Sequence, residues 1–243
     1  MDKSIVDKLI SWAEKYNDPQ YFTEDPIIFP KHFAGLYRNG EAKLADVEIA
    51  AILASHLAWG RRAMIVRDCN RMFEEMGWRP YEYVMGGVYR DEDVSLHRTI
   101  KWKEFAAICH RLKILYSERD SLEGMSDTEI RCRIYGQKED RKAPNKKISM
   151  MRRWLVRDDG KVDLGVWRKS DKKDLILPLD VHVYGQATAL GLTCRKQKDI
   201  VTAQEITDAF RRIFPDDPCL GDFALFGYGV TNGTNGQKDD IKG

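Results

Sequence analysis

One aspartate and a pair of lysines are the residues of this chain whose types and surroundings could support chemistry. Asp180 stands in the apolar stretch LILPLDVHVYGQATALGL, directly after Pro178 and Leu179. A carboxylate in such a stretch is costly to bury unless something uses its charge. Proline biases the preceding residue away from a helix, and helical spacing follows Asp180, so this residue is placed to be the N-cap of a buried helix. The first amide groups and the helix dipole favour its ionised form there.

Capping alone would account for Asp180, because aspartate is a common N-cap and needs no catalysis to explain it. A metal site shared with His182 is disfavoured, since the two positions lie about 200° apart on a helix. His182 is instead a candidate contact for a DNA phosphate, or a half-exposed helical residue. A serine hydrolase would need a G-x-S-x-G element, which the sequence lacks.

The cysteines give no sign of a metal centre. The chain has five, they are scattered, and none forms a C-x-x-C pair. This pattern argues against a zinc site, a cysteine-bound iron–sulfur cluster and a disulfide framework. We therefore expect neither a metal nor a cofactor.

Lys146 and Lys147 open a second segment with helical spacing, KKISMMRRWLV. An amine becomes a nucleophile when it is partly neutral, a state that burial or neighbouring cations produce. Otherwise both are phosphate-contacting or solvated lysines. They belong to a basic stretch, residues 131–157, with ten lysines and arginines against two acidic residues, whereas the whole chain has a formal net charge of only +2. Such a stretch suits a polyanion, or else forms a solvated helix face.

The elements that must position these residues are helices. Residues 46–57, 61–76, 101–120 and 202–214 each carry apolar side chains at helical spacing, with Asp46 expected as the N-cap of the first. Thr202 and Glu205 have capping-box spacing at the start of the last. Sustained β-branched alternation is missing, so we predict an all-α fold. We expect one two-lobed helical domain over residues 1–230 and a flexible tail over 231–243.

Composition suggests a globular, cytoplasmic protein. Apolar residues make up 43% of the chain and charged residues 32%, an ordinary globular balance. No apolar run approaches the roughly twenty residues that a membrane helix needs. The N-terminal segment MDKSIVDKLISWAEKY is amphipathic and has no signal-peptide core. We therefore expect no membrane partner and a cytoplasmic location, associated with the nucleoid if the protein binds DNA.

The order of these motifs resembles that of the helix-hairpin-helix DNA glycosylases, the endonuclease III superfamily. The segment LPLDVHVYGQATALGL is similar to the one that holds the catalytic aspartate in that superfamily, and residues 45–77 and 202–229 are similar to its flanking helices. Over most of its length the chain resembles more closely an uncharacterised family, DUF2400, through the segments IFPKHF, LASHLAWGRR, MRRWLVRDDGKVDLGVW and LPLDVHV. The resemblance implies a two-lobed glycosylase-like fold.

The chain departs from the superfamily pattern at its hairpin. The pattern L-P-G-h-G-x-K-T-A is replaced by RKAPNKKIS, so the glycines that let backbone amides approach a DNA phosphate are gone. The resemblance thus implies a degenerate helix-hairpin-helix. An insert at residues 157–173 lengthens the gap between lysine and aspartate, a layout similar to that of the archaeal 8-oxoguanine DNA glycosylases.

The resemblance implies a base-excision DNA glycosylase acting on a damaged purine such as 8-oxoguanine in duplex DNA with a flipped base. Asp180 is implied to be the catalytic acid. Lys146, or Lys147 in the neighbouring register, is implied to form a Schiff base that gives AP-lyase activity, with a slight preference for Lys146. The remaining implied contacts are the wedge His56, the base-pocket walls Trp59 and Trp154, and the phosphate ligands Arg61, Arg62, Arg152, Arg153 and His182.

Each implied contact also has a structural interpretation. Tryptophans at helical spacing are commonly core residues, and arginines are commonly solvated. The lost hairpin glycines favour an alternative function, a protein that binds DNA or RNA on a glycosylase-like scaffold without cutting a base. A nucleotide- or RNA-modifying enzyme is a third reading. The oligomeric state, the target base and the pathway are left open by the sequence.

Overall fold

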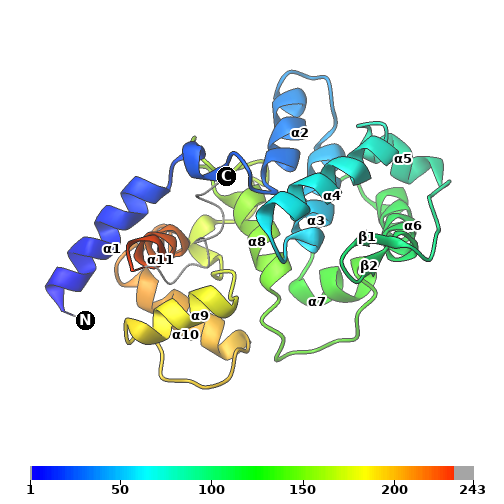
Figure 1. Ribbon diagram of the computed structural model, residues 1–243. Coiled ribbons are helices and arrows are strands. Elements are labelled where there is room, and N and C mark those ends of the chain that lie inside the picture. The colour runs from blue at the N-terminus through cyan, green and yellow to red at the C-terminus, as the bar shows by residue number, and fades with distance from the viewer. Residues whose placement is uncertain (1, 233–243) are drawn as a thin grey trace.

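The computed structural model describes residues 2–232, and within them the fold is built mostly of helices (Figure 1). The α-helices are α1 (Lys3–Tyr16), α2 (Ile28–Arg38), α3 (Leu44–Leu57), α4 (Arg62–Glu75), α5 (Pro80–Gly86), α6 (Trp102–Glu118), α7 (Asp127–Glu129), α8 (Lys146–Val156), α9 (Val181–Ala189), α10 (Ile200–Arg211) and α11 (Leu220–Thr231). Short 3-10 turns lie at Pro19–Phe22 (η1) and Lys172–Asp174 (η3), and a π-helical turn, η2 (Ile130–Ile134), continues α7. The predicted helical class is confirmed.

The expectation of a purely α-helical chain needs one correction. Strands β1 (Ser95–His97) and β2 (Ile100–Lys101) form a small antiparallel hairpin, turned at Arg98, whose φ of +53° is left-handed. Strand β1 is three residues long and β2 is two residues long, and the consecutive residues Leu96 and His97 of β1 are both buried. Because a strand this short shows no alternation of period two, the sequence pattern could not reveal it.

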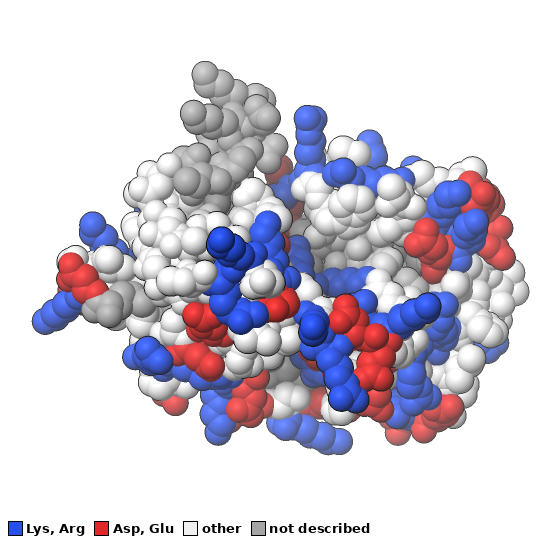
Figure 2. Space-filling model, turned by 90° about the horizontal axis from the view of Figure 1, so that it is seen from below, with Lys and Arg blue, Asp and Glu red and all other residues white. Residues whose placement is uncertain are grey.

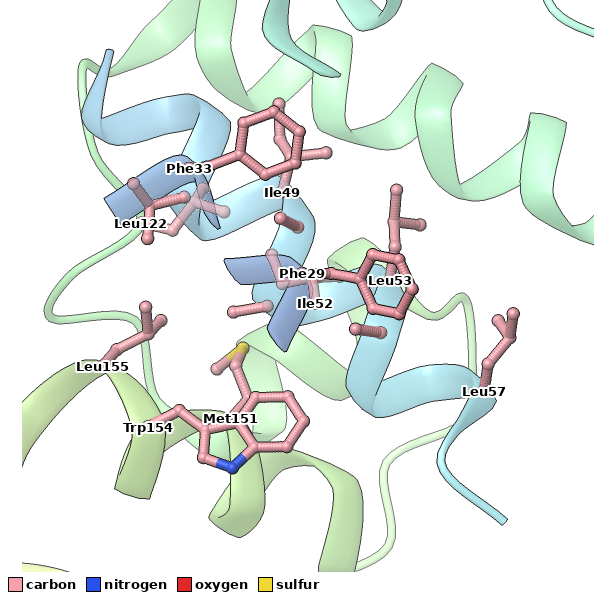
Figure 3. Packing of buried hydrophobic residues seen from close by; sticks show 14 of the residues in the cluster. Phe29, Phe33, Ile49, Ile52, Leu53, Leu57, Leu122, Met151, Trp154 and Leu155 are labelled. Carbon is pink, nitrogen blue, oxygen red and sulfur yellow. The ribbon is translucent and has the colours of Figure 1, made fainter. Parts of the chain in front are cut away.

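The buried apolar side chains form two clusters. The larger one joins α2 to α6, α8 and the segment 162–167, and the smaller one joins α1, α9, α10 and α11 with residues 177–179. Figure 1 shows these groups side by side, with α8 between them. In Figure 3, Met151 and Trp154 of α8 face Phe29 of α2 and Ile52 of α3. Helix α3 is buried on nearly all sides and forms the centre of the larger cluster.

Two helices begin at other residues than the sequence predicted. Helix α3 has Lys43 as its N-cap, and Asp46 is the third helical residue, whose carboxylate accepts the backbone N–H groups of Lys43 and Tyr81 at 2.9 Å each. Helix α10 is capped by Asp199, which accepts the Thr202 backbone N–H at 2.9 Å. An aspartate satisfies free amides from either position, so local sequence does not separate the two registers.

Helix α11 extends one residue into the segment that the sequence predicts to be a flexible tail. Thr231, the first residue of that predicted tail, is the last residue of α11, and its hydroxyl donates to the Gly227 carbonyl at 2.8 Å. The predicted tail from residue 233 onwards lies outside the described residues.

Helices α1 and α11 pack closely at Gly227. A Cβ atom at this glycine would lie 2.7 Å from Trp12 Cβ and 2.7 Å from Tyr16 Cε2. We expect Gly227→Ala to lower the free energy of unfolding by about 1–3 kcal/mol through overpacking, measured by urea denaturation. The matched control is Gly185→Ala in α9, where nothing lies within 4 Å of the added atom. That variant should be neutral or slightly stabilised, and equal destabilisation of both would contradict the packing argument.

Candidate active site

Asp180 is the N-cap of α9, as predicted. Its backbone is extended, and its Oδ1 accepts the backbone N–H groups of His182 and Val183 at 2.9 Å each. Within the described residues no hydrogen bond reaches Oδ2, and the residue is half-buried. Its charge raises the pKa of a neighbouring carboxyl, Asp222, after the larger effect of burial. One carboxylate oxygen therefore caps the helix, and the other has no hydrogen-bond partner among the described residues.

Replacing Asp180 separates the capping role from any chemical one. We expect Asp180→Ala to lower the free energy of unfolding by about 1 kcal/mol, because two amides at the start of α9 lose their acceptor. Asp180→Asn, which keeps a capping oxygen, should retain most of that stability. Urea denaturation of both variants tests this, and an equal loss in both would show that the charge, rather than the cap, provides the stability.

Lys147 and His56 meet although they lie 91 residues apart in the chain. The Lys147 Nζ lies 3.0 Å from His56 Nδ1, and 4.0 Å from the centroid of the Tyr135 ring. The His56 ring stacks on the same tyrosine, with centroids 5.1 Å apart and an interplanar angle of 17°. No carboxylate pairs with this amine among the residues that the structure describes. The Lys147 amine at the start of α8 is thus enclosed by His56, near the end of α3, and by Tyr135, the residue after η2.

The electrostatics of this group follow from burial without a counter-charge. Burial, and after it the positive charge of Arg131, lower the pKa of Lys147 to about 8, while the charge of Glu104 acts in the opposite direction. Burial also lowers the pKa of His56 to about 3, helped by the charges of Lys147 and His97. The imidazole is therefore neutral at pH 7, and it accepts a hydrogen bond that the lysine donates.

Lys146 has a different environment. Its Nζ donates a hydrogen bond of 3.0 Å to the backbone carbonyl of Ala58, the residue that ends α3. A cation at a helix C-terminus satisfies a free carbonyl and complements the helix dipole. Lys146 is therefore a C-cap for α3, and the features of a reactive amine belong to Lys147.

Trp59 lies next to this C-cap, and its indole is 39% exposed. The Arg98 guanidinium lies 4.3 Å from the centre of its ring, and the buried His97 meets its edge. His97 holds the Trp59 carbonyl at 2.9 Å through Nε2 and the Asp68 carboxylate at 2.7 Å through Nδ1. These two contacts tie the backbone of Trp59 to Asp68 of α4. Trp59 is thus an exposed aromatic surface on a fixed backbone.

The family comparison identifies the chain. The model of the family described as "Protein of unknown function (DUF2400)" matches residues 25–136 and 126–231, which is most of the chain. The chain belongs to the DUF2400 family. No curated protein and no solved structure matches this DUF2400 protein.

Two of the expected DNA contacts in the DUF2400 protein are core residues instead. Trp154 has no exposed surface, and it packs in the larger apolar cluster, so it cannot form a wall of a base pocket (Figure 3). Arg153 is 5% exposed and pairs with Asp222 and Asp163. A cation that is already paired in the interior is not a phosphate ligand. Both expectations were wrong because the buried face of α8 continues around to these positions.

The other expected contact residues differ in whether their side chains already form bonds within the protein. Arg152 pairs with Asp127 at 2.7 Å and also donates to the Met125 carbonyl, so it ties α8 to α7. Arg62 is half-buried and donates to the Tyr21 carbonyl at 3.4 Å. Arg61 and His182 are exposed. Among these candidates, the last two have the side chains most accessible to solvent.

In the described part of the chain, five of the ten lysines and arginines in the basic stretch at residues 131–157 form ion pairs, namely Arg133, Arg141, Arg152, Arg153 and Arg157. Arg133 pairs with Glu118 at 2.7 Å, and Arg141 pairs with Glu139 at 2.8 Å. Arg157, which is fully buried, pairs with Asp217 at 2.9 Å and with Asp163. Figure 2 accordingly shows basic and acidic side chains intermixed over the middle of the face seen from below.

Several features of a complete catalytic site are absent around Lys147 and Asp180 in the described residues of the DUF2400 protein. Lys147 and Asp180 form no ion pair in the described part of the chain. Two surface hollows, of about 440 and 370 Å³, are not lined by Lys147 or Asp180. Over residues 2–232, no group of three or more His, Cys, Asp or Glu side chains could hold a metal ion. None of the described helices is long and apolar enough to cross a bilayer.

Proposed function

We propose that this DUF2400 protein is a DNA glycosylase that uses Lys147 as its nucleophile and excises a damaged purine such as 8-oxoguanine. The observation that carries the proposal is the enclosed Lys147 amine, with a pKa of about 8 and no carboxylate partner among residues 2–232. At pH 7 about a tenth of such amines are unprotonated, against about 0.03% for an ordinary lysine. The choice of a purine rests on the resemblance to the archaeal 8-oxoguanine glycosylases.

The proposed reaction begins when the unprotonated amine attacks C1′ of a nucleotide flipped out of the duplex. The C1′–N9 bond breaks, its electron pair leaves with the purine, and the purine takes up a proton. The nitrogen now bonded to C1′ loses a proton, and the C1′–O4′ bond breaks as O4′ gains one, which leaves a protonated Schiff base. Water hydrolyses this imine to an abasic sugar, or loss of a 2′ proton eliminates the 3′ phosphate.

Asp180 has the second role in this proposal. A carboxylate stabilises the positive charge that develops on the sugar as the base leaves. Its Oδ1 is occupied by two amides of α9, so Oδ2 would face the sugar. The proposal requires a bound sugar to contact both the Lys147 amine and the Asp180 carboxylate, which form no ion pair within residues 2–232.

Contacts to the rest of the DNA would come from the segment that follows α3. Trp59 is exposed and next in the chain to the carbonyl that Lys146 caps, and an indole stacks on any nucleobase. Arg61 is exposed two residues later and is suited to a phosphate. The C-terminal end of α3 would thus present a stacking surface and a cation beside the reactive amine.

A second candidate is a protein that binds nucleic acid without cutting a base. The observation in its favour is that Trp154, one of the two expected walls of a base pocket, is fully buried in the core, whereas a flipped base needs a pocket.

Borohydride trapping tests the proposal. The protein is incubated with duplexes that carry 8-oxoguanine, uracil, thymine glycol or an abasic site, and borohydride reduces any imine to a stable adduct. A covalent adduct on a base-lesion duplex, with matching base release, is the expected result. Binding without an adduct, and without alkali-labile sites on any lesion, would overturn the glycosylase and favour the second candidate.

A further inference from the structure

We infer that His56 is a positioning residue for Lys147. In this arrangement His56 Nδ1 accepts a hydrogen bond from the Lys147 amine, and this bond holds Nζ over the ring of Tyr135. The expected role of His56 was a wedge in the DNA stack, and the contacts point inward instead. The catalytic consequence of this inference rests on the proposed function, whereas the contact itself does not.

The geometry joins three side chains into one stack. His56 lies flat on Tyr135, and Lys147 Nζ lies 3.0 Å from the imidazole and 4.0 Å from the phenol ring centroid. Tyr135 is itself fixed, because its buried hydroxyl donates to the Ile52 carbonyl at 3.2 Å. An ammonium over an aromatic face is favourable, and the histidine fixes where over the face it lies.

The charges around the stack decide what His56 can do. Its pKa of about 3 makes it too weak a base to keep the lysine proton. It is therefore an acceptor and an orienting group, and the proton of Lys147 leaves to solvent or to substrate. The other charged groups that act on the pair are Arg131 and Glu104 on Lys147, and His97 on His56.

The hydrogen bond from Lys147 to His56 Nδ1 requires one particular tautomer of the neutral imidazole. If Nδ1 accepts from Lys147, the hydrogen of the neutral ring is on Nε2. The Nε2 atom is buried and has no hydrogen-bond partner among the described residues. A buried N–H without an acceptor is unfavourable, so the ring is held in this orientation by its contacts with Lys147 and Tyr135.

This bond also directs the nucleophile. An unprotonated amine that donates one hydrogen to His56 has its lone pair pointing in another direction, where it can attack. His56 thus reduces the orientations that Lys147 samples without blocking its lone pair.

Two measurements test the inference without any DNA. In the wild-type protein, long-range ¹H–¹⁵N spectra report the tautomer of each histidine, and His56→Gln identifies the His56 signals by their loss. We expect a neutral ring that carries its hydrogen on Nε2 from pH 5 to pH 8. A hydrogen on Nδ1 would overturn the inference, because that nitrogen could not then accept from Lys147.

The second measurement is competitive labelling of lysines with acetic anhydride from pH 6 to pH 11, read by mass spectrometry. His56→Gln keeps an acceptor, so the Lys147 midpoint should stay near that of the wild type. His56→Phe keeps the stacked ring and removes the acceptor, so the midpoint should fall by about one pH unit, a tenfold change. An unchanged midpoint in His56→Phe would overturn the inference. If that variant does not fold, the wild-type tautomer decides.

These results are separate from the fate of the proposed function. Failure to trap an adduct on DNA, with the expected tautomer and labelling midpoints, would remove the glycosylase and leave the His56–Lys147 pair. A trapped adduct together with an unchanged Lys147 midpoint in His56→Phe would support the glycosylase and remove the His56–Lys147 pair.

Discussion

The Lys147→Gln variant is expected to lose the borohydride-trapped adduct, by about a thousandfold or more. Glutamine is close to lysine in length but has no nucleophilic amine, so no imine forms. In the wild-type protein the rate of adduct formation should rise about tenfold per pH unit up to the pKa of Lys147, about 8, and level off above it. The direction follows because the unprotonated amine reacts and its fraction grows as the pH rises through that pKa.

The neighbouring lysine is the matched control. Lys146→Gln removes a C-cap contact with Ala58, so we expect a small loss of stability and an adduct yield near that of the wild type. Trapping on the lesion duplex, with circular dichroism of both variants, distinguishes lost chemistry from lost folding. Loss of the adduct in Lys146→Gln and its survival in Lys147→Gln would reverse the assignment of the nucleophile.

The Arg157→Met variant is expected to lose about 3–5 kcal/mol of unfolding free energy. Arg157 is fully buried, its Nε and Nη2 contact the Asp217 carboxylate at 2.9–3.0 Å, and Asp159 lies 3.2 Å from Nη2. Asp163 pairs with Nη1. Removing the guanidinium leaves these carboxylates in the interior without their counter-charge, which is more costly than the loss of the pair itself. Urea denaturation at pH 7 measures the effect.

An exposed arginine in the same loop provides the control. Arg168 pairs with Asp158 at 2.5 Å, and both side chains are more than half exposed. We expect Arg168→Met to change stability by less than about 0.5 kcal/mol, because solvent screens exposed pairs. The argument from burial fails if the two variants are equally destabilised.

Local patterns were enough to predict most of the helices and the N-cap at Asp180. Apolar spacing marks α3, α4, α6 and α10, and the proline before Asp180 fixes where α9 begins. Exact starting residues were harder, because an aspartate at the third helical position and one at the cap satisfy the same amides. Asp46 shows this ambiguity.

The interior ion pairs could not be predicted, because their partners are distant in the sequence. Arg157 and Asp217 are 60 residues apart, and Arg153 and Asp222 are 69 apart. A count of charges over a continuous stretch therefore gives an excess of positive charge that carboxylates from elsewhere in the folded chain partly offset. Only the tertiary arrangement separates a buried arginine from a phosphate ligand.

The candidate site was predicted in part. The sequence singled out both lysines, and it placed them at a helix start, which is where α8 begins. The resemblance gave a slight preference to Lys146, whereas the features of a reactive amine belong to Lys147, because the two environments depend on which part of α3 each side chain reaches. Tyr135 was missed altogether, since nothing around RIYG marks a tyrosine that faces a lysine.

Helix α1 packs against α11, and this pairing affects the order in which the protein can form during synthesis. Trp12 meets Tyr228 with ring centroids 5.7 Å apart, and the two residues are separated by almost the whole described chain. A ribosome adds about 5–20 residues per second, so α1 emerges roughly 10–40 seconds before its partner. Most residues of the larger cluster precede α9 in the chain, so this cluster can condense meanwhile, whereas the smaller one is completed last. During that interval the apolar face of α1 is exposed to other nascent chains and to chaperones.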